Sequence, residues 1–262
     1  MPDHYTYPGT EVLVNIPGYT DPAAWKEAET AVIGLRVREL VRTPISGDFD
    51  LAHLQAIHAR LVEGFYTWGG QLRDTNTGPG GTGIAHCLPE FIPDEADRVF
   101  GALAGMDYLK GRDRAGFSAG LAWTWGETTA IHPFRDVNTR SQFTLFNQLA
   151  VEAGWVIDWN QIDPHVFAHA RTVAIYRDPD GLEALLHPAL IPVASIRADD
   201  LPERMEQAAA EFTRPRPRRD VDALDRELRA ALQRRANQVD PDPSFGPPPR
   251  RGPGPQDRGL GL

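Results

Sequence analysis

Repeated amphipathic segments, bounded by helix-capping and helix-breaking residues, constrain the fold of this chain more than any other feature. Asp21-Pro22 and Asp163-Pro164 each place an N-capping side chain before a first-turn proline, and apolar residues then recur at helical spacing. The pattern predicts helices near residues 22–42, 51–64, 93–109, 114–130, 138–153, 163–177, 181–187, 199–212 and 220–238. We therefore expect a mainly all-α helical bundle.

Residues 75–83 interrupt the helical pattern. This segment holds four glycines and Pro79, so it predicts a loop or the tip of one small β-hairpin. We expect four regions along the chain. They are an N-terminal arm and helix at 1–47, a catalytic domain at 48–197, a helical extension at 198–238, and a disordered tail rich in Pro, Arg and Gly at 239–262.

Composition limits the classes of function. No apolar run approaches the ~20 residues that cross a bilayer, and the first residues show no signal peptide. The single cysteine, Cys87, excludes an intramolecular disulfide and a multi-cysteine zinc site. We expect a cytoplasmic protein without a membrane partner, compatible also with delivery into another cell by a specialised secretion system.

The charge is unevenly distributed. Residues 213–262 hold eleven arginines against seven acids, whereas the first 212 residues carry a net charge of −13. An acidic globular part argues against nucleic acid as a partner. The basic end is typical of a solvated extension, with contact to nucleic acid or an acidic protein as the alternative.

The segment from Ile131 to Arg140, called the motif here, concentrates the chemistry. Pro133 should end the preceding helix, and Asn138 is a favourable N-cap for the next one. A helix N-terminus attracts anions such as phosphate. Near it, His132 can move protons at neutral pH, while Asp136 can bind Mg²⁺. The alternatives are an ordinary turn histidine, a turn aspartate and a simple helix cap.

The motif, His-Pro-Phe-Arg-Asp-Val-Asn-Thr-Arg, resembles the Fic (Fido) signature His-x-Phe-x-(Asp/Glu)-Gly-Asn-Gly-Arg. Similar stretches occur in family order over roughly residues 7–195. They are Tyr7-Pro8-Gly9-Thr10, which is similar to secretion-system- and toxin-linked Fic proteins, then Tyr66-x-Trp68-Gly69-Gly70, Pro89-Glu90-Phe91-Ile92 and Gly154-Trp155. The resemblance implies a Fic-type helical bundle with a β-hairpin flap.

The resemblance also implies transfer of AMP from ATP, with Mg²⁺, to a Ser, Thr or Tyr hydroxyl of a target protein. It assigns catalysis to His132, Asp136, Asn138 and Arg140, with His132 as general base. It assigns phosphate binding to Val137, Asn138, Thr139 and Arg140, and the metal to Asp136. It assigns docking of the target to a flap at Thr75, Asn76, Thr77 and Gly78. We expect Phe134 to be a buried anchor and Arg135 to face solvent.

Three positions depart from the family pattern. Val137 and Thr139 replace glycines, and Phe143 replaces an arginine three residues after Arg140. If residue 137 has a positive φ, valine there is strained by about 1–3 kcal/mol. The alternatives to AMP transfer are a Doc-like protein kinase and a degenerate Fic fold that acts as a binding module.

Regulation follows from the same resemblance. The inhibitory Ser/Thr-x-x-x-Glu-Gly motif is not intact, since Ala59 stands where it would begin before Glu63-Gly64. We therefore expect a toxin held by a separate small antitoxin that supplies a glutamate, or no inhibition of this kind.

Overall fold

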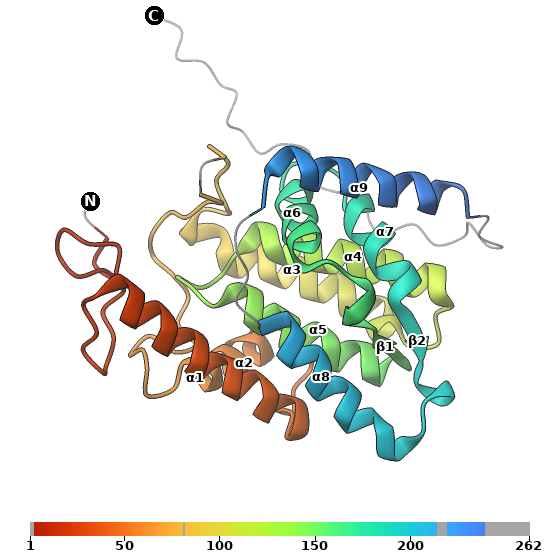
Figure 1. Cartoon of the computed structure of the whole chain (residues 1–262), viewed down its shortest axis with the longest axis horizontal. Helices are drawn as coiled ribbons and strands as arrows, with labels where there is room; N and C mark the ends of the chain where they lie inside the picture. Colours follow the sequence, from red (N-terminus) through yellow and green to blue (C-terminus); the bar gives the residue numbers. More distant parts are fainter. Residues whose placement is uncertain (1–2, 81, 214–218, 239–262) are drawn as a thin grey trace, which may run out of the picture.

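The computed structural model describes residues 3–80, 82–213 and 219–238 as a bundle of helices (Figure 1). The predicted tail at 239–262 lies outside the described residues. The α-helices are α1 (Pro22–Arg42), α2 (Leu51–Val62), α3 (Ile92–Gly105), α4 (Arg114–Ile131), α5 (Asn138–Glu152), α6 (Pro164–Ala174), α7 (Asp180–Ala189), α8 (Leu201–Thr213) and α9 (Val221–Ala236). The predicted helices are present, with ends that differ by a few residues.

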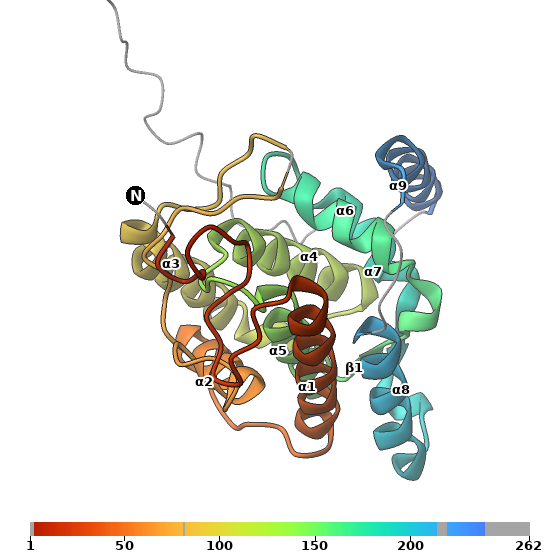
Figure 2. The ribbon, with the colours of Figure 1, turned by 60° about the vertical axis from the view of Figure 1, so that its left-hand side comes forward.

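Helices α4 and α5 form the centre of the bundle. Helices α1 and α2 cover them on one side and α6 and α7 on the other, with α9 outside α6 and α7 (Figures 1 and 2). Helix α4 is buried on nearly all faces. Its buried threonines Thr124, Thr128 and Thr129 each donate to the carbonyl four residues earlier, so their hydroxyls need no water.

An aromatic cluster packs α8 against α5. Phe143 of α5 stacks on Phe212 of α8 with ring centres 4.0 Å apart, and Trp159 lies 5.0 Å from Phe143. Phe143 is 1% exposed. The side chain that stands in place of the family arginine is therefore part of the apolar core.

The sheet has two short strands, β1 (Trp155–Ile157) and β2 (Leu190–Pro192), which pair antiparallel with Val156 opposite Ile191. The predicted fold class, mainly helical with a small antiparallel sheet, is confirmed. The position of the hairpin is a correction, because the described residues of the flap contain no strand. Glycine and proline leave the flap few side chains and N–H groups to pair. Among its described residues, the main-chain bond from His86 N–H to Thr77 O and the side-chain contact of the same two residues join its two arms.

The N-terminal arm crosses the bundle near the motif. Arg135 donates from Nε to the Asp3 carboxylate at 2.9 Å and is half-buried, so the prediction that Arg135 faces solvent was wrong. The division into four regions stays a prediction. No helix in the described part of the chain combines the length and apolarity that crossing a bilayer requires.

Candidate functional site

His132 lies directly after the end of α4, as the following proline predicted. Its backbone is left-handed, with φ +48° and ψ +64°, and its N–H donates to Thr128 O at 3.1 Å. The buried Arg73 donates from Nε to His132 O at 2.7 Å and from Nη2 to Ile131 O at 3.1 Å. A cation at the carbonyl end of α4 complements the helix dipole and fixes the backbone that carries the imidazole.

The His132 imidazole stacks on that of His86, with ring centres 3.8 Å apart and planes within 5°. Thr77 Oγ1 lies 2.9 Å from His86 Nδ1, so the flap reaches the motif through this second histidine. Burial lowers the pKa of His132 well below its ordinary value, and the charges of His86, Arg171 and Arg73 lower it further. Burial likewise lowers the pKa of His86 to about 4, assisted by Arg73 and Arg171. Both imidazoles are therefore neutral near pH 7, and His132 can accept a proton.

Phe134 and Asn138 hold the loop between α4 and α5. Phe134 is fully buried and its ring stacks on His58 at 3.8 Å, which confirms the predicted anchor. Asn138 Oδ1 accepts from Phe134 N–H at 2.9 Å, and its Nδ2 donates to Phe134 O at 2.7 Å. Asn138 therefore braces the loop. It does not cap α5, because the N-cap residue is Val137, which has no polar side chain.

Val137 has φ +64° and is 2% exposed. The backbone at residue 137 is therefore left-handed, although valine is β-branched and the family signature has glycine at this position. Since no side chain caps α5, the N–H groups of its first turn remain available to an anion. Asp136 is half-buried beside them, and its Oδ1 accepts from Val137 N–H at 2.5 Å.

Arg140, in the first turn of α5, faces α1. Its Nη2 lies 3.3 Å from Oε2 of Glu29, whose side chain is fully buried. Glu29 also accepts from Tyr66 Oη and from Lys26 Nζ, each at 2.8 Å. Burial alone would raise the pKa of Glu29, but Arg140 and Lys26 outweigh it, so that pKa lies below its ordinary value. The carboxylate therefore stays charged and holds Arg140.

Sequence reasoning missed Glu29, His86 and Arg171 of α6, whose guanidinium contacts Thr139. One signal was available: Glu29 stands four residues before Ile33 and eight before Val37, a helical spacing that places an acid in line with apolar residues, where it needs a partner.

The flap residues are only partly brought to the motif. Thr77 reaches it through His86, and Thr75 O accepts from Arg73 Nη1 at 2.7 Å. Asn76 and Gly78 are exposed. The flap therefore borders the His86–His132 pair on one side and faces solvent on the other.

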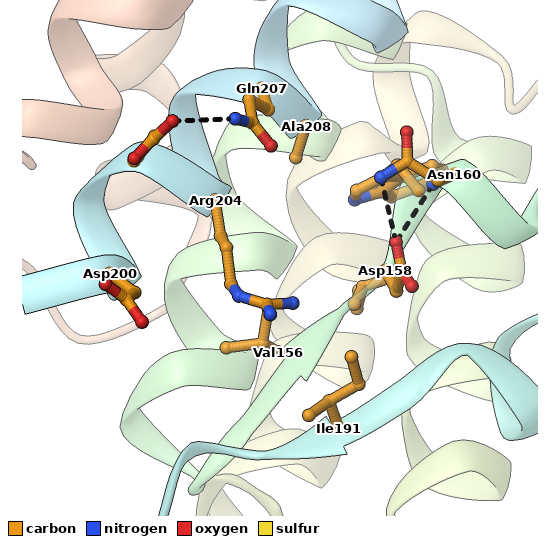
Figure 3. Close-up of a pocket in the computed structure, with 11 residues that line it drawn as sticks. Val156, Asp158, Asn160, Ile191, Asp200, Arg204, Gln207 and Ala208 are labelled. Atoms are coloured by element: carbon orange, nitrogen blue, oxygen red, sulfur yellow. Dashed lines mark hydrogen bonds between the residues drawn. The ribbon is translucent and has the colours of Figure 1, made fainter. Parts of the chain in front are cut away.

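A separate pocket of about 310 Å³ lies between the sheet and α8. Figure 3 shows Arg204 of α8 beside Val156 of β1, and Asp158 bonded to Asn160. The sheet follows the C-terminal end of α5, whereas the motif is at its N-terminal end, about 20 Å away along a 15-residue helix. This pocket is not part of the motif site.

The structure sets the His132 imidazole one short loop before the uncapped, arginine-bearing N-terminus of α5, an arrangement whose groups suit an anion and a proton acceptor. A model described as the Fic/DOC family matches residues 48–150. The Probable protein adenylyltransferase y4lH of Sinorhizobium fredii is 36% identical over 169 residues, which cover 64% of this chain and 85% of that protein. The chain belongs to the Fic/DOC family.

Two further relatives bear on the extent of the similarity. The Protein adenylyltransferase VbhT of Bartonella schoenbuchensis is 35% identical over 184 residues, and the match covers 70% of this chain but only 38% of VbhT. The structure of the BepC protein with bound AMPPNP from Bartonella tribocorum has a TM-score of 0.66 at 24% identity, covering 72% of this chain and 96% of that one. The latter likeness shows the fold.

Proposed function

We propose that this chain transfers AMP from ATP to a hydroxyl of a target protein. One observation carries the proposal. The neutral imidazole of His132 stands one short loop before the uncapped start of α5, which bears Arg140. The relatives named protein adenylyltransferases support the same chemistry. We propose Ser, Thr or Tyr as the target side chain and the cytoplasm of the producing or a recipient cell as the place of action.

In this reaction the target oxygen forms a bond to the α-phosphorus of ATP. The bond from that phosphorus to the oxygen bridging to the β-phosphate breaks, and pyrophosphate leaves. The hydroxyl proton passes to His132. His132 Nδ1 is enclosed by protein without a hydrogen-bond partner among the described residues, so proton exchange falls to Nε2.

The start of α5 would bind the negatively charged pyrophosphate as it leaves. The first-turn N–H groups and Arg140 would hold the phosphates, with Val137, Asn138 and Thr139 supplying backbone around them. The proposed target-docking flap would align the target backbone along Thr75, Asn76, Thr77 and Gly78 by main-chain pairing.

Asp136 fits the role of a Mg²⁺ ligand. Its half-buried carboxylate points to the start of α5, and no group of three or more acidic, histidine or cysteine side chains in the described ranges could hold a metal by itself. One carboxylate completed by phosphate oxygens and water is the usual Mg²⁺ arrangement at nucleotides. When bound, Mg²⁺ neutralises phosphate charge; Asp136 positions it.

The test is transfer of label from ATP labelled at the α or the γ position, with and without Mg²⁺. We expect α-label on protein, reduced about 10²–10⁴-fold in His132→Ala. Label from the γ position alone would replace the proposal with a Doc-like kinase. A folded protein that transfers neither label would be a binding module.

The labelling experiment can be repeated with added proteins whose genes lie in the same operon as the gene for this chain. A separate antitoxin that supplies a glutamate is the proposed regulator, with no glutamate-type inhibition as the alternative. Restored growth and loss of label on co-expression of a short helical protein would support the antitoxin.

A further inference from the structure

Arg171 is a buried arginine whose bonded partners are all neutral. It comes from α6 and is 5% exposed. Its Nη1 donates to Thr139 Oγ1 and its Nη2 to Gln142 Oε1, each at 2.8 Å, while Nε donates to Thr129 Oγ1 at 3.2 Å. Three bonds position the guanidinium firmly, but none of them compensates its charge.

A buried charge is unfavourable unless an opposite charge compensates it. In the part of the chain that the structure describes, Arg98 pairs with Glu127 and Arg140 with Glu29. Arg73 is also buried without a described carboxylate in an ion pair, but it donates to carbonyls at the C-terminal end of α4, where the negative end of the helix dipole compensates its charge. No described carboxylate forms an ion pair with Arg171. Burial lowers the pKa of Arg171 to about 10, which still leaves the side chain charged at neutral pH. The fold therefore keeps an uncompensated cation in its interior.

The position of Arg171 in the fold indicates which kind of ligand its charge would meet. Thr129 is in the last turn of α4, and Thr139 is in the first turn of α5, so the guanidinium lies between the two helix ends that border the motif loop. Its charge reaches both His132 and His86, since it lowers the pKa of each. The positive end of the α5 dipole acts at the same place. An anion bound there would meet two sources of positive potential.

We propose that Arg171 is a phosphate-binding residue, whose guanidinium compensates an anionic oxygen of the nucleotide held at the start of α5. The inference rests on the proposed function, because it takes the nucleotide as the ligand. It also accounts for Phe143: with an aromatic residue in the core at that position, positive charge comes instead from α6, 28 residues later in the sequence.

The test compares the binding of ATP and adenosine to the full chain by calorimetry, in wild type and in Arg171→Gln. Glutamine keeps a polar side chain but removes the charge. Loss of one charge-assisted contact should weaken ATP about 10–100-fold while adenosine changes less than about twofold. Inorganic tripolyphosphate is the second probe and should weaken in parallel with ATP.

Arg114→Gln is the matched control. Arg114 is half-buried and, like Arg171, donates only to neutral groups, here the carbonyls of His187 and Leu190, at the opposite end of α4 from the motif. This substitution should lower thermal stability and leave the ratio of ATP to adenosine affinity unchanged. If Arg171→Gln does not fold, Arg171→Lys carries the test, because it keeps the charge and loses donors; ATP should weaken about three- to tenfold with adenosine constant.

Equal weakening of ATP and adenosine in the Arg171 variants, or no weakening of either, would overturn the inference and leave Arg171 a structural residue. A wild type that binds neither ATP nor tripolyphosphate would overturn it as well. Failure of the proposed function is distinguishable: the wild type would then bind ATP without transferring AMP, and the binding comparison would still decide the role of Arg171.

Discussion

Two arginine side chains lie at the start of α5, one directed toward α1 and one coming from α6, and they are held in different ways. Arg140 faces α1 and is paired with the buried Glu29 carboxylate, whereas Arg171 comes from α6 and meets only hydroxyl and amide oxygens. The α1 side is electrostatically complete without a ligand. The α6 side is not. We infer that the α1 side sets geometry and that the α6 side supplies the charge that an anionic ligand would satisfy.

The difference between the two arginines implies that position 143, inside the apolar core, does not accept a charged side chain. Phe143→Arg would place a guanidinium among the aromatic rings of Trp159 and Phe212. We expect the free energy of unfolding to fall by about 3–5 kcal/mol, measured by urea denaturation. Phe143→Leu, the control that keeps the site apolar, should lose about 1–2 kcal/mol. A stable Phe143→Arg protein that binds ATP more tightly would remove the distinction between the two sides.

The α1 side can be tested through Glu29. Glu29→Gln removes the charge that holds Arg140 while leaving a side chain of similar size for Tyr66. We expect a loss of about 1–3 kcal/mol in the free energy of unfolding at pH 7 and a severalfold rise in KM for ATP. Glu39→Gln is the control on the same helix; its exposed pair with Arg60 should contribute less than about 1 kcal/mol.

The Glu29 contribution should also depend on pH. Its pKa is lower in the folded protein than its ordinary value, so the carboxylate stabilises the fold above the unfolded pKa of about 4.3. That stabilisation is lost as the pH falls through the folded pKa. The stability difference between wild type and Glu29→Gln should therefore be full at pH 7 and shrink below about pH 4. A difference that stays constant to low pH would mean that packing, not charge, links α1 to Arg140.

Local features of the site were predictable from sequence, because neighbouring residues determine them. Pro133 ended α4 at the expected place, and Phe134, the large apolar residue of the motif loop, is buried as expected. The family glycine at residue 137 pointed to a positive φ, which Val137 has. Asn138 was the local error: its amide can bond either the α5 backbone or the loop, and the loop offered both a donor and an acceptor at Phe134.

The contacts that distinguish the two arginines were not predictable in this way. Glu29 and Arg140 are 111 residues apart, and Arg171 and Thr139 are 32 apart. Helical periodicity says which face of α1 or α6 is buried, but not which helix it packs against or in what register. Polar residues on a buried stripe were the available signal, and they call for a partner without identifying it.

Substitution of Val137, at the start of α5, is expected to have the smallest effect on stability. At an ordinary φ, Val→Gly loses buried surface and adds backbone entropy, which together cost about 2–4 kcal/mol. At residue 137, relief of the left-handed backbone should offset about 1–2 kcal/mol of this. Val137→Gly should therefore destabilise less than Val12→Gly, a fully buried control without a positive φ, by that amount in urea unfolding.

The same substitution also tests how the charge of Arg171 acts on a bound phosphate. Without the Val137 side chain, phosphate can approach the first turn of α5 more closely, where Arg140 and Arg171 both act, so ATP affinity should rise a fewfold by calorimetry. The gain should be smaller in Val137→Gly combined with Arg171→Gln than in Val137→Gly alone, because the closer phosphate would then lose the uncompensated cation. Equal gains in both backgrounds would place the bound phosphate on the Arg140 side only, and the α6 charge would need another explanation.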